Sequence, residues 1–436
     1  MSRLRAVPEH PTEPNGPKAL LIVRNAFDHD SRVLRAAKTV QSLGFQTTVL
    51  AVVSFTERRQ LTDQDGIQVR RIGPTTRFAW FVYRHTSNLA PGPATAPGGA
   101  PSRPSLESRV LSRVKGVLRP FMRWSSTLFY YRQGITEVIR MKPDLVHCND
   151  YNTMWIGVGA RYLAGSKVIY DSHELWPDRN LRPEPRWWLI LCERLFVRVA
   201  HRVITASPGY SEEMARRYGI PVPPAICNVP ELTPEERAML PPERESPGAG
   251  REAVYVGGLM KNRGIEQSIR AIAHVPGGRL RLLGPGPPAF RAELEQLVDE
   301  TGTRDQVEFV PPVPSGDVVR ALADADVGLC LIQPACLSYE LTMPNKLFEY
   351  VLAGLPVLGS DFPIIGRFVE ERKVGLVVDP EDVDAIAAAL REMLDPATNA
   401  AFRAAAARAS REITWAIERD KLIEVYRDVL PLPEAA

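Results

Sequence analysis

Short apolar runs alternate with helix-period segments along most of this 436-residue chain. The run from Ala19 to Val23 is apolar throughout, and a segment with helical spacing follows it, ends near Gly44 and leads into a second apolar run. This order predicts a βαβ unit that opens a parallel sheet. Three later runs, PDLVHC, KVIYDSHE and HRVITAS, each end in a polar cluster. We therefore predict a parallel α/β domain over residues 18–238, behind a disordered leader at 1–17.

The pattern begins again after a polar stretch with Pro and Gly at residues 239–252, which is typical of a linker between domains. Apolar runs such as AVYVGGL, RLRLLGPG and DVGLCLI then alternate with helical segments over 253–412, and a last helix is predicted at 413–431. The predicted fold class is α/β, with two Rossmann-like doubly wound domains facing a central cleft. Such a cleft is the usual place for a ligand.

One interruption of the first domain is rich in Pro, Gly and Ala, and it predicts a flexible loop at 87–105. A basic segment with apolar residues at helical spacing follows it and predicts an amphipathic helix at about 106–123. This helix either covers the sheet with a solvated basic face or binds an anionic lipid or a phosphorylated acceptor.

Composition and charge exclude several classes of protein. The 54 basic and 51 acidic residues give a net charge of +3, which does not indicate nucleic-acid binding. Five scattered cysteines indicate neither a disulfide framework nor a zinc site, and they favour a reducing cytoplasm. No apolar run approaches the ~20 residues of a membrane span, so any membrane contact is expected to be peripheral. The oligomeric state is left open.

Candidate chemistry begins with the stretch MPNKLFEYVLAGLPVLGSD, in which Pro344 predicts the start of a helix that opens with Asn345. Lys346 would add positive charge to the helix end that already attracts anions, which favours a bound anion such as a diphosphate. Glu349 lies one turn further on, and its carboxylate can accept hydrogen bonds from the two hydroxyls of a ribose. The alternative interpretation is a surface Lys–Glu pair.

Other candidates follow the predicted strands. Gly257 and Gly258 end one strand, Gly284 follows another, and Arg263 lies in the loop after the first, which suits phosphate binding but also suits ordinary tight turns. His173 directly follows a strand of the first domain and is a candidate for contact with a substrate hydroxyl, although a lone histidine is more often structural. Further polar residues at strand ends of the first domain are candidates for the acceptor side: Asn25, Asp30, Arg32, His147, Asp150 and Glu174.

Several catalytic motifs are absent from the sequence. It has no HExxH, no Walker A loop, no GxSxG elbow and no DxD-type pair in a setting that would hold a divalent ion. We therefore predict chemistry that needs neither a metal nor another cofactor.

Taken in order, the stretches DSRVLRAAKTVQSLGFQTTVLA, PDLVHCND, KVIYDSHELWP, YVGGLMKNRGIEQSIRAI, LLGPGP and MPNKLFEYVLAGLPVLGSD resemble glycosyltransferase family 4, the group 1 glycosyl transferases. The resemblance implies a GT-B fold and retaining hexosyl transfer from a nucleotide sugar to a hydroxyl-bearing acceptor. It implies that Glu349 holds the ribose, that Arg263 and Lys346 grip the diphosphate, and that His173 reaches the transferred sugar.

The chain departs from this family pattern at two positions. Leu341 stands where the first glutamate of the family's glutamate pair is expected, and Gly258 stands where an arginine is often found. Glu340 would replace the missing glutamate only if the loop were shifted. Two other functions stay open: a nucleotide-sugar epimerase of the same architecture, and a degenerate transferase that serves as a scaffold.

Overall fold

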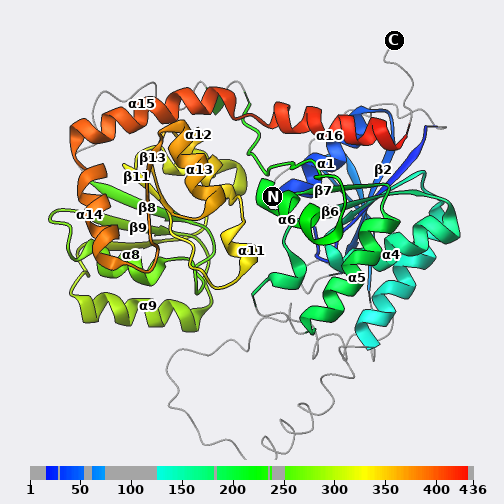
Figure 1. Ribbon diagram of the computed structural model, residues 1–436, viewed down its shortest axis with the longest axis horizontal. Helices are drawn as coiled ribbons and strands as arrows, with labels where there is room; N and C mark the ends of the chain where they lie inside the picture. Colours follow the sequence, from blue (N-terminus) through cyan, green and yellow to red (C-terminus); the bar gives the residue numbers. More distant parts are fainter. Residues whose placement is uncertain are drawn as a thin grey trace, which may run out of the picture. The chain divides into compact units, whose positions relative to one another are not determined.

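The strands form two separate sheets in the computed structural model (Figure 1). The structure describes residues 16–27, 30–53, 61–73, 125–180, 184–233, 236–237 and 251–430. The loop predicted at 87–105, the basic helix predicted at about 106–123 and most of the predicted leader and linker lie outside these residues.

The first sheet has seven strands in the order β3-β4-β2-β1-β5-β6-β7. Its strands are β1 Lys18–Ile22, β2 Gln46–Val52, β3 Leu61–Gln64, β4 Ile67–Ile72, β5 Leu145–Asn149, β6 Lys167–Ser172 and β7 Arg202–Thr205. β1 lies between β2 and β5 and is parallel to both, whereas β3 is antiparallel to β4. The βαβ unit predicted at the start of the chain is thus confirmed.

The helical segments between these strands are α1 Ser31–Ser42, a helix over 125–141, η1 Tyr151–Thr153, α4 Met154–Gly159, η2 Ala160–Ala164, η3 Trp176–Asp178, α5 Arg186–Val199 and α6 Pro208–Tyr218. Local sequence explains the ends of α1. The Asp30 side chain accepts a hydrogen bond from the Val33 amide and so caps the first turn. After the last turn, Gly44 has φ +88°, a conformation that favours glycine.

The second sheet has six parallel strands in the order β10-β9-β8-β11-β12-β13. They are β8 Glu252–Val256, β9 Arg279–Leu283, β10 Val307–Val310, β11 Val327–Cys330, β12 Val357–Ser360 and β13 Gly375–Val378. The helical segments that follow β8 in the chain are α8 Ile265–Ile272, α9 Pro288–Thr301, η4 Ser315–Asp317, α10 Val318–Leu322, α11 Leu337–Glu340, α12 Asn345–Leu352, α13 Pro363–Arg372, α14 Val383–Met393, α15 Pro396–Glu412 and α16 Trp415–Val429.

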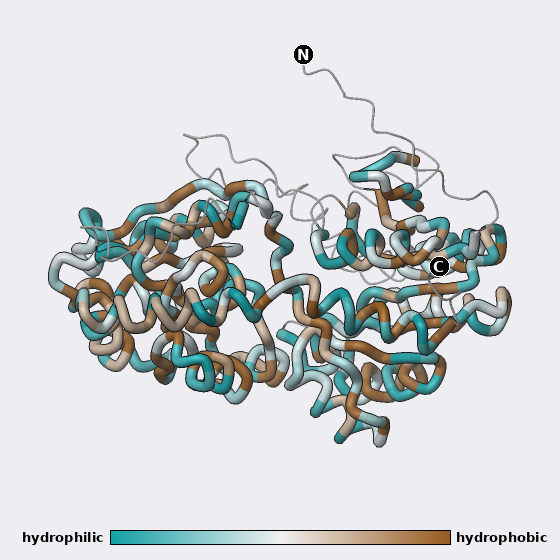
Figure 2. Tube along the Cα trace, turned by 90° about the horizontal axis from the view of Figure 1, so that it is seen from above, coloured by the Kyte–Doolittle hydropathy of each residue, from teal (hydrophilic) through white to brown (hydrophobic). Residues whose placement is uncertain are grey.

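Two apolar cores enclose the second sheet, one on each face. Residues of α10, α12, α13 and α15 form one core, and residues of α8, α9 and α14 form the other. Figure 2 shows hydrophobic and hydrophilic residues alternating along the helical turns, as expected where a helix covers a core with one side only. This is the doubly wound arrangement predicted from the sequence.

The chain packs as two compact units. One consists of residues up to Asp171, Leu195–Arg202 and the chain from Tyr426 on, and the other of Ser172–Arg194 and Val203–Val425. The domain ranges 18–238, 253–412 and 413–431 stay a prediction. Among the described residues, no helix combines the length and the apolar composition that crossing a bilayer requires.

Candidate functional site

Helix α12 is fixed to the second sheet by one tyrosine. The Tyr350 hydroxyl donates a hydrogen bond to the Leu329 carbonyl of β11 at 3.0 Å and accepts one from the Val256 amide of β8 at 3.1 Å. Gly328 makes room for the ring, because a Cβ there would lie 2.3 Å from it. Lys346 precedes Tyr350 by one helical turn, so this anchor also fixes the first turn of α12.

Lys346 is a buried cation without a hydrogen-bonding partner among the described residues. Its side chain is 9% exposed, and its Nζ atom lies 3.7 Å from the centre of the Tyr255 ring. Burial, partly opposed by Cys330, is the main reason that the pKa of Lys346 is lowered to about 8, and the smaller effects of Arg263, which lowers it, and of Glu349, which raises it, are included in that value. A buried ammonium in this state favours an anion as its partner.

The start of α12 lacks its usual neutralising groups. The residue before the helix is Pro344, no side chain described by the structure caps the first turn, and that turn contains no acid. The free N–H groups and the helix dipole therefore add to the field of Lys346. Together they form a site suited to a phosphate group.

Two glycines allow the backbone to approach this site. Gly257 has φ +126°, and a Cβ there would lie 3.9 Å from Lys346 Nζ. Gly284 has φ +147°, and a Cβ there would meet the Gly257 carbonyl at 2.1 Å. The turn is held by the Tyr255 hydroxyl, which donates to the Gly258 carbonyl at 2.8 Å. Gly258 differs from both, because a Cβ there would meet only Met260, at 3.8 Å.

Three other residues predicted to bind the donor lie near Lys346. Arg263 is half-buried in the loop before α8, with its guanidinium 4.7 Å from the centre of the Tyr339 ring. Glu349 is half-buried on α12, close enough to affect the pKa of Lys346. Asn345 is exposed as the first residue of that helix. The structure therefore brings Lys346, Arg263 and Glu349 into one electrostatic neighbourhood.

The loop that carries His173 is hydrogen-bonded to α11. The Leu175 amide donates to Ser338 Oγ at 3.3 Å, and the Tyr210 hydroxyl donates to the Ser338 carbonyl at 2.8 Å. His173 is half-buried in this loop, and Glu174 is exposed with its carboxylate 3.7 Å from Arg179.

Leu341, at the position of the expected glutamate, is the residue directly after α11. Its carbonyl accepts a hydrogen bond from Ser207 Oγ at 2.6 Å, and Gly209 leaves the room that this contact needs. These contacts hold the backbone at Leu341 in the structure, and a role of Glu340 in place of the missing glutamate stays a prediction.

Among the acceptor-side candidates, Arg32 and His147 lie in a buried network. Arg32 donates to both carboxylate oxygens of Asp171, at 2.7 and 3.0 Å. His147 is hydrogen-bonded through Nε2 to Asp171 at 3.3 Å and through Nδ1 to the Tyr426 hydroxyl at 2.9 Å. Both side chains are therefore occupied by protein partners.

The remaining acceptor-side candidates lie at strand ends of the first sheet. Asn25 donates to the Asp30 carboxylate at 2.8 Å, and Asp30 caps α1. Asp150 follows β5 with φ +67°, which is uncommon for a residue other than glycine. Their roles toward an acceptor stay predictions.

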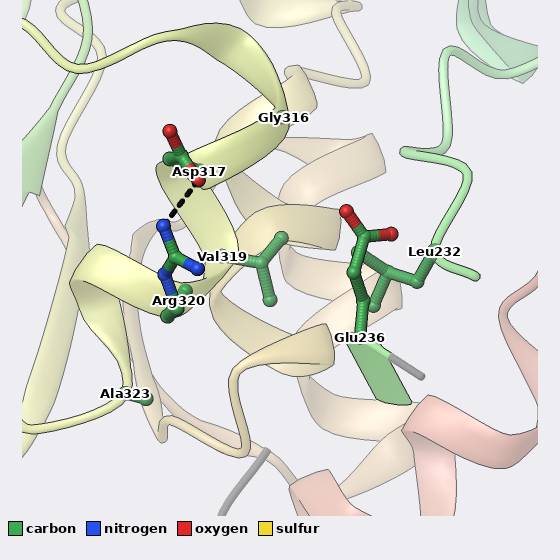
Figure 3. A pocket seen from close by; sticks show the side chains of 7 residues that line it. All are labelled: Leu232, Glu236, Gly316, Asp317, Val319, Arg320 and Ala323. Atoms are coloured by element: carbon green, nitrogen blue, oxygen red, sulfur yellow. Dashed lines mark hydrogen bonds and ion pairs between the residues drawn. The ribbon is translucent and has the colours of Figure 1, made fainter. Parts of the chain in front are cut away.

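A pocket elsewhere in the second unit does not suit a large ligand. Figure 3 shows it between η4, α10 and the chain near Leu232, with Glu236 on one side and the ion pair of Asp317 and Arg320 on the other. Its volume of about 40 Å³ accommodates only a few water molecules. In the part of the chain that the structure describes, no three His, Cys, Asp or Glu residues gather as metal ligands would.

Sequence reasoning missed two residues of this site. Tyr255 forms the wall under Lys346, and Tyr350 positions it. Both tyrosines are buried among apolar residues, so their spacing gave no signal. Only the position of Tyr255, two residues before Gly257 at the end of a strand, was a usable hint.

Comparison with known proteins identifies the class to which this fold and site belong. The sequence model of the group 1 glycosyl transferases matches residues 250–396, and that of the glycosyl transferase 4-like domain matches residues 29–228. The fold is GT-B, and the chain belongs to the group 1 glycosyltransferases of the family 4 type. It is a transferase enzyme.

Individual proteins resemble this chain at low sequence identity. The chain is 26% identical over 352 residues to a D-inositol 3-phosphate glycosyltransferase of Thermobispora bispora, covering 75% of this chain and 77% of the relative. A sucrose-phosphate synthase from Thermosynechococcus elongatus has a similar structure, with a TM-score of 0.70, 18% identity and coverage of 95% and 99%. Anabaena HepE, solved in complex with UDP-glucose, matches with a TM-score of 0.61, 15% identity and coverage of 94% and 99%.

Proposed function

We propose that this enzyme transfers a hexosyl group from a nucleotide-diphosphate sugar to an acceptor hydroxyl, with retention of the anomeric configuration. The buried ammonium of Lys346 carries the proposal, because it lies at an uncapped helix start beside the Gly257 turn, without a hydrogen-bonding partner among the described residues. The solved complex of HepE with UDP-glucose supports this choice of donor.

The chemistry follows from the charges. When the bond between the sugar and the diphosphate breaks, negative charge grows on the leaving phosphate and the sugar becomes oxocarbenium-like. Lys346, Arg263 and the first N–H groups of α12 would stabilise that charge more strongly in the transition state than in the bound donor. We propose that these cationic groups replace a metal and that the leaving phosphate accepts the proton of the acceptor hydroxyl on the same face.

Other residues would position the donor. Glu349 would accept hydrogen bonds from the ribose hydroxyls, one turn of α12 away from Lys346. His173 would reach a hydroxyl of the transferred sugar. Because Leu341 offers no hydrogen-bonding side chain, the sugar would be held by fewer polar groups than a glutamate pair provides.

The test is turnover by the purified chain with a panel of UDP- and GDP-hexoses, read as release of the nucleoside diphosphate. Lys346→Ala and Arg263→Ala should each lower turnover at least ~10²-fold, the scale for loss of one preorganised transition-state donor. Lys261→Ala is the matched control, because Lys261 lies in the same loop as Arg263 but is exposed, and it is paired with Glu293 at 2.9 Å.

The outcomes also separate the rival functions. Normal turnover in both variants would contradict the proposed roles. An epimer formed from the donor alone would identify an epimerase, and nucleotide binding without turnover in the natural chain would identify a scaffold. Retention is checked separately, by NMR of the anomeric proton of the product.

A further inference from the structure

Helix α5 spans Arg186–Val199 (Figure 1). Large apolar side chains lie on its exposed side. Trp187, Trp188, Leu191 and Leu195 are 67%, 42%, 54% and 42% exposed. Residues 187, 191 and 195 are spaced by one turn each and so form one stripe, with Trp188 beside it. The opposite side is buried and comprises Leu189, Cys192, Glu193, Phe196, Val197 and Val199.

This apolar stripe differs from other exposed apolar residues. Among the described residues, Leu61, Val222, Met260 and Ile417 are exposed singly. Leu128 with Phe129 and Tyr162 with Leu163 are exposed as pairs, but neither pair continues, within the part of the chain that the structure describes, as a row of exposed large apolar side chains at one-turn spacing. Such scattered residues are normal on a protein surface, whereas a contiguous row indicates an interaction site. The two indole rings also pack edge to face, 5.9 Å apart, and so form one broad aromatic surface.

Positive charge borders the apolar stripe. Arg194 and Arg198 lie three and seven residues after Leu191, which places both along the same side of α5. Both are exposed. The helix contains a single acidic residue, Glu193, which is buried and accepts a hydrogen bond from the Tyr218 hydroxyl. The exposed side of α5 is therefore aromatic and cationic, without an acid of its own.

We propose that the exposed side of α5 binds the surface of a lipid bilayer that carries anionic headgroups. Tryptophan favours the headgroup level of a membrane, and arginine is attracted to anionic lipids. A helix with an apolar stripe and basic residues beside it lies in the plane of the interface, with the apolar side chains inserted.

A second copy of the chain fits this surface less well. A two-fold contact through α5 would place the same patch on both subunits and bring Arg194 and Arg198 close to their own copies. A bilayer instead supplies negative charge opposite both arginines. This proposal does not depend on the donor site, because it is argued from residues of α5 alone.

The test is flotation of the full chain with vesicles of phosphatidylcholine alone or mixed equally with phosphatidylglycerol. We expect binding to the anionic vesicles, weakened by salt. Trp187→Ser with Trp188→Ser should lower the partition constant at least about tenfold, because the main inserted groups are lost. Arg194→Gln with Arg198→Gln should lower it by a similar factor on anionic vesicles only. Ile417→Ser is the matched control, an exposed apolar residue on another helix.

A second measurement keeps the proposal testable if a variant folds poorly. Brominated lipids should quench the tryptophan fluorescence of the natural chain, and Trp187→Phe with Trp188→Phe should keep the binding and lose most of the quenching. Absence of vesicle binding, equal binding to neutral vesicles, or unchanged binding in the serine variant would each overturn the proposal. So would a dimer of the natural chain that the serine variant dissolves, because the occupant would then be a second copy.

Discussion

Arg32 and Lys346 hold the same position in two helices, and their surroundings are opposite. Each is the second residue of its helix, and each is buried, at 7% and 9% exposure. Arg32 has both oxygens of Asp171 as partners, and its helix is capped by Asp30. Among the described residues, Lys346 lies against an aromatic ring and has no carboxylate at hydrogen-bonding distance, and none of their side chains caps its helix.

The difference indicates what each cation is for. A buried charge that is fully paired needs nothing from outside the protein, and replacing only one partner leaves the other uncompensated. A buried charge left unpaired costs stability, so its retention is best explained by a ligand that completes it. Burial alone does not separate a structural cation from a binding one, whereas the hydrogen-bond inventory does.

The largest effect on stability is expected at the paired cation. Arg32→Met should lower the free energy of unfolding by roughly 3–5 kcal/mol, because Asp171 would remain buried without its counter-charge. Urea unfolding of the purified chain measures the change. The control is Arg140→Met, because Arg140 is 52% exposed and its partner Glu137 keeps a second ion pair with Arg70, so the loss should be about 1 kcal/mol or less. Equal losses of stability in the two variants would contradict the distinction between a buried, paired cation and a surface ion pair.

Lys346 should have the opposite effect on stability, and that effect should depend on pH. Its pKa of about 8 in the folded chain lies below the ordinary lysine value of 10.5, so between these values the unfolded chain binds more protons. Stability relative to Lys346→Met should therefore rise with pH across that window, by on the order of 3 kcal/mol. Unfolding midpoints at pH 7.5 and 10.5 test this. A constant difference between the two proteins would mean that the lysine is already paired.

If Lys346 binds a diphosphate as proposed, the affinity for a nucleotide should fall as Lys346 loses its proton. A diphosphate binds the charged form of Lys346, so the Kd for UDP should rise by up to tenfold per pH unit above about 8. Calorimetry measures the profile. Lys346→Ala should bind weakly at every pH and lose this dependence, and a persistent slope in that variant would assign the titration to another group.

The smallest effect on stability is expected at Tyr426, at the edge of the buried network that joins Arg32, Asp171 and His147. Tyr426→Phe removes the hydroxyl at 2.9 Å from His147 Nδ1 and leaves that buried nitrogen without this partner. The expected loss is about 1 kcal/mol, measured by thermal unfolding. Tyr162→Phe, at an exposed tyrosine, is the control. No loss at Tyr426 would show that the network ends at Asp171.

Much of the fold could be predicted because its signals are local. Apolar runs marked the strands, and Pro344 and Gly354 marked the start and end of α12, where Gly354 has φ +71°. The sequence led to the same prediction for Gly284 and Gly258, that each lets the backbone approach a phosphate, and this stays a prediction. The structure separates them, because a side chain at 284 would collide with the Gly257 carbonyl and one at 258 would not.

The site was harder to predict because its partners come from distant segments. Sequence reasoning grouped His147 and Arg32 with possible acceptor contacts, because each follows a strand. In the structure, both bind Asp171, which is 24 and 139 residues away along the chain. Hydrogen bonds of this kind depend on strand register and helix packing, which no local pattern encodes.

The sequence by itself determined two α/β domains built on mainly parallel sheets, the glycosyltransferase family and the presence of a lysine at the start of a particular helix. Only the tertiary structure decided that this lysine is buried against Tyr255 with no hydrogen-bonding partner described, while Arg32 in the same helical position is paired. The physical reason is that periodicity and turn residues act over a few neighbours, whereas the desolvation and pairing of a charge depend on every segment that packs around it.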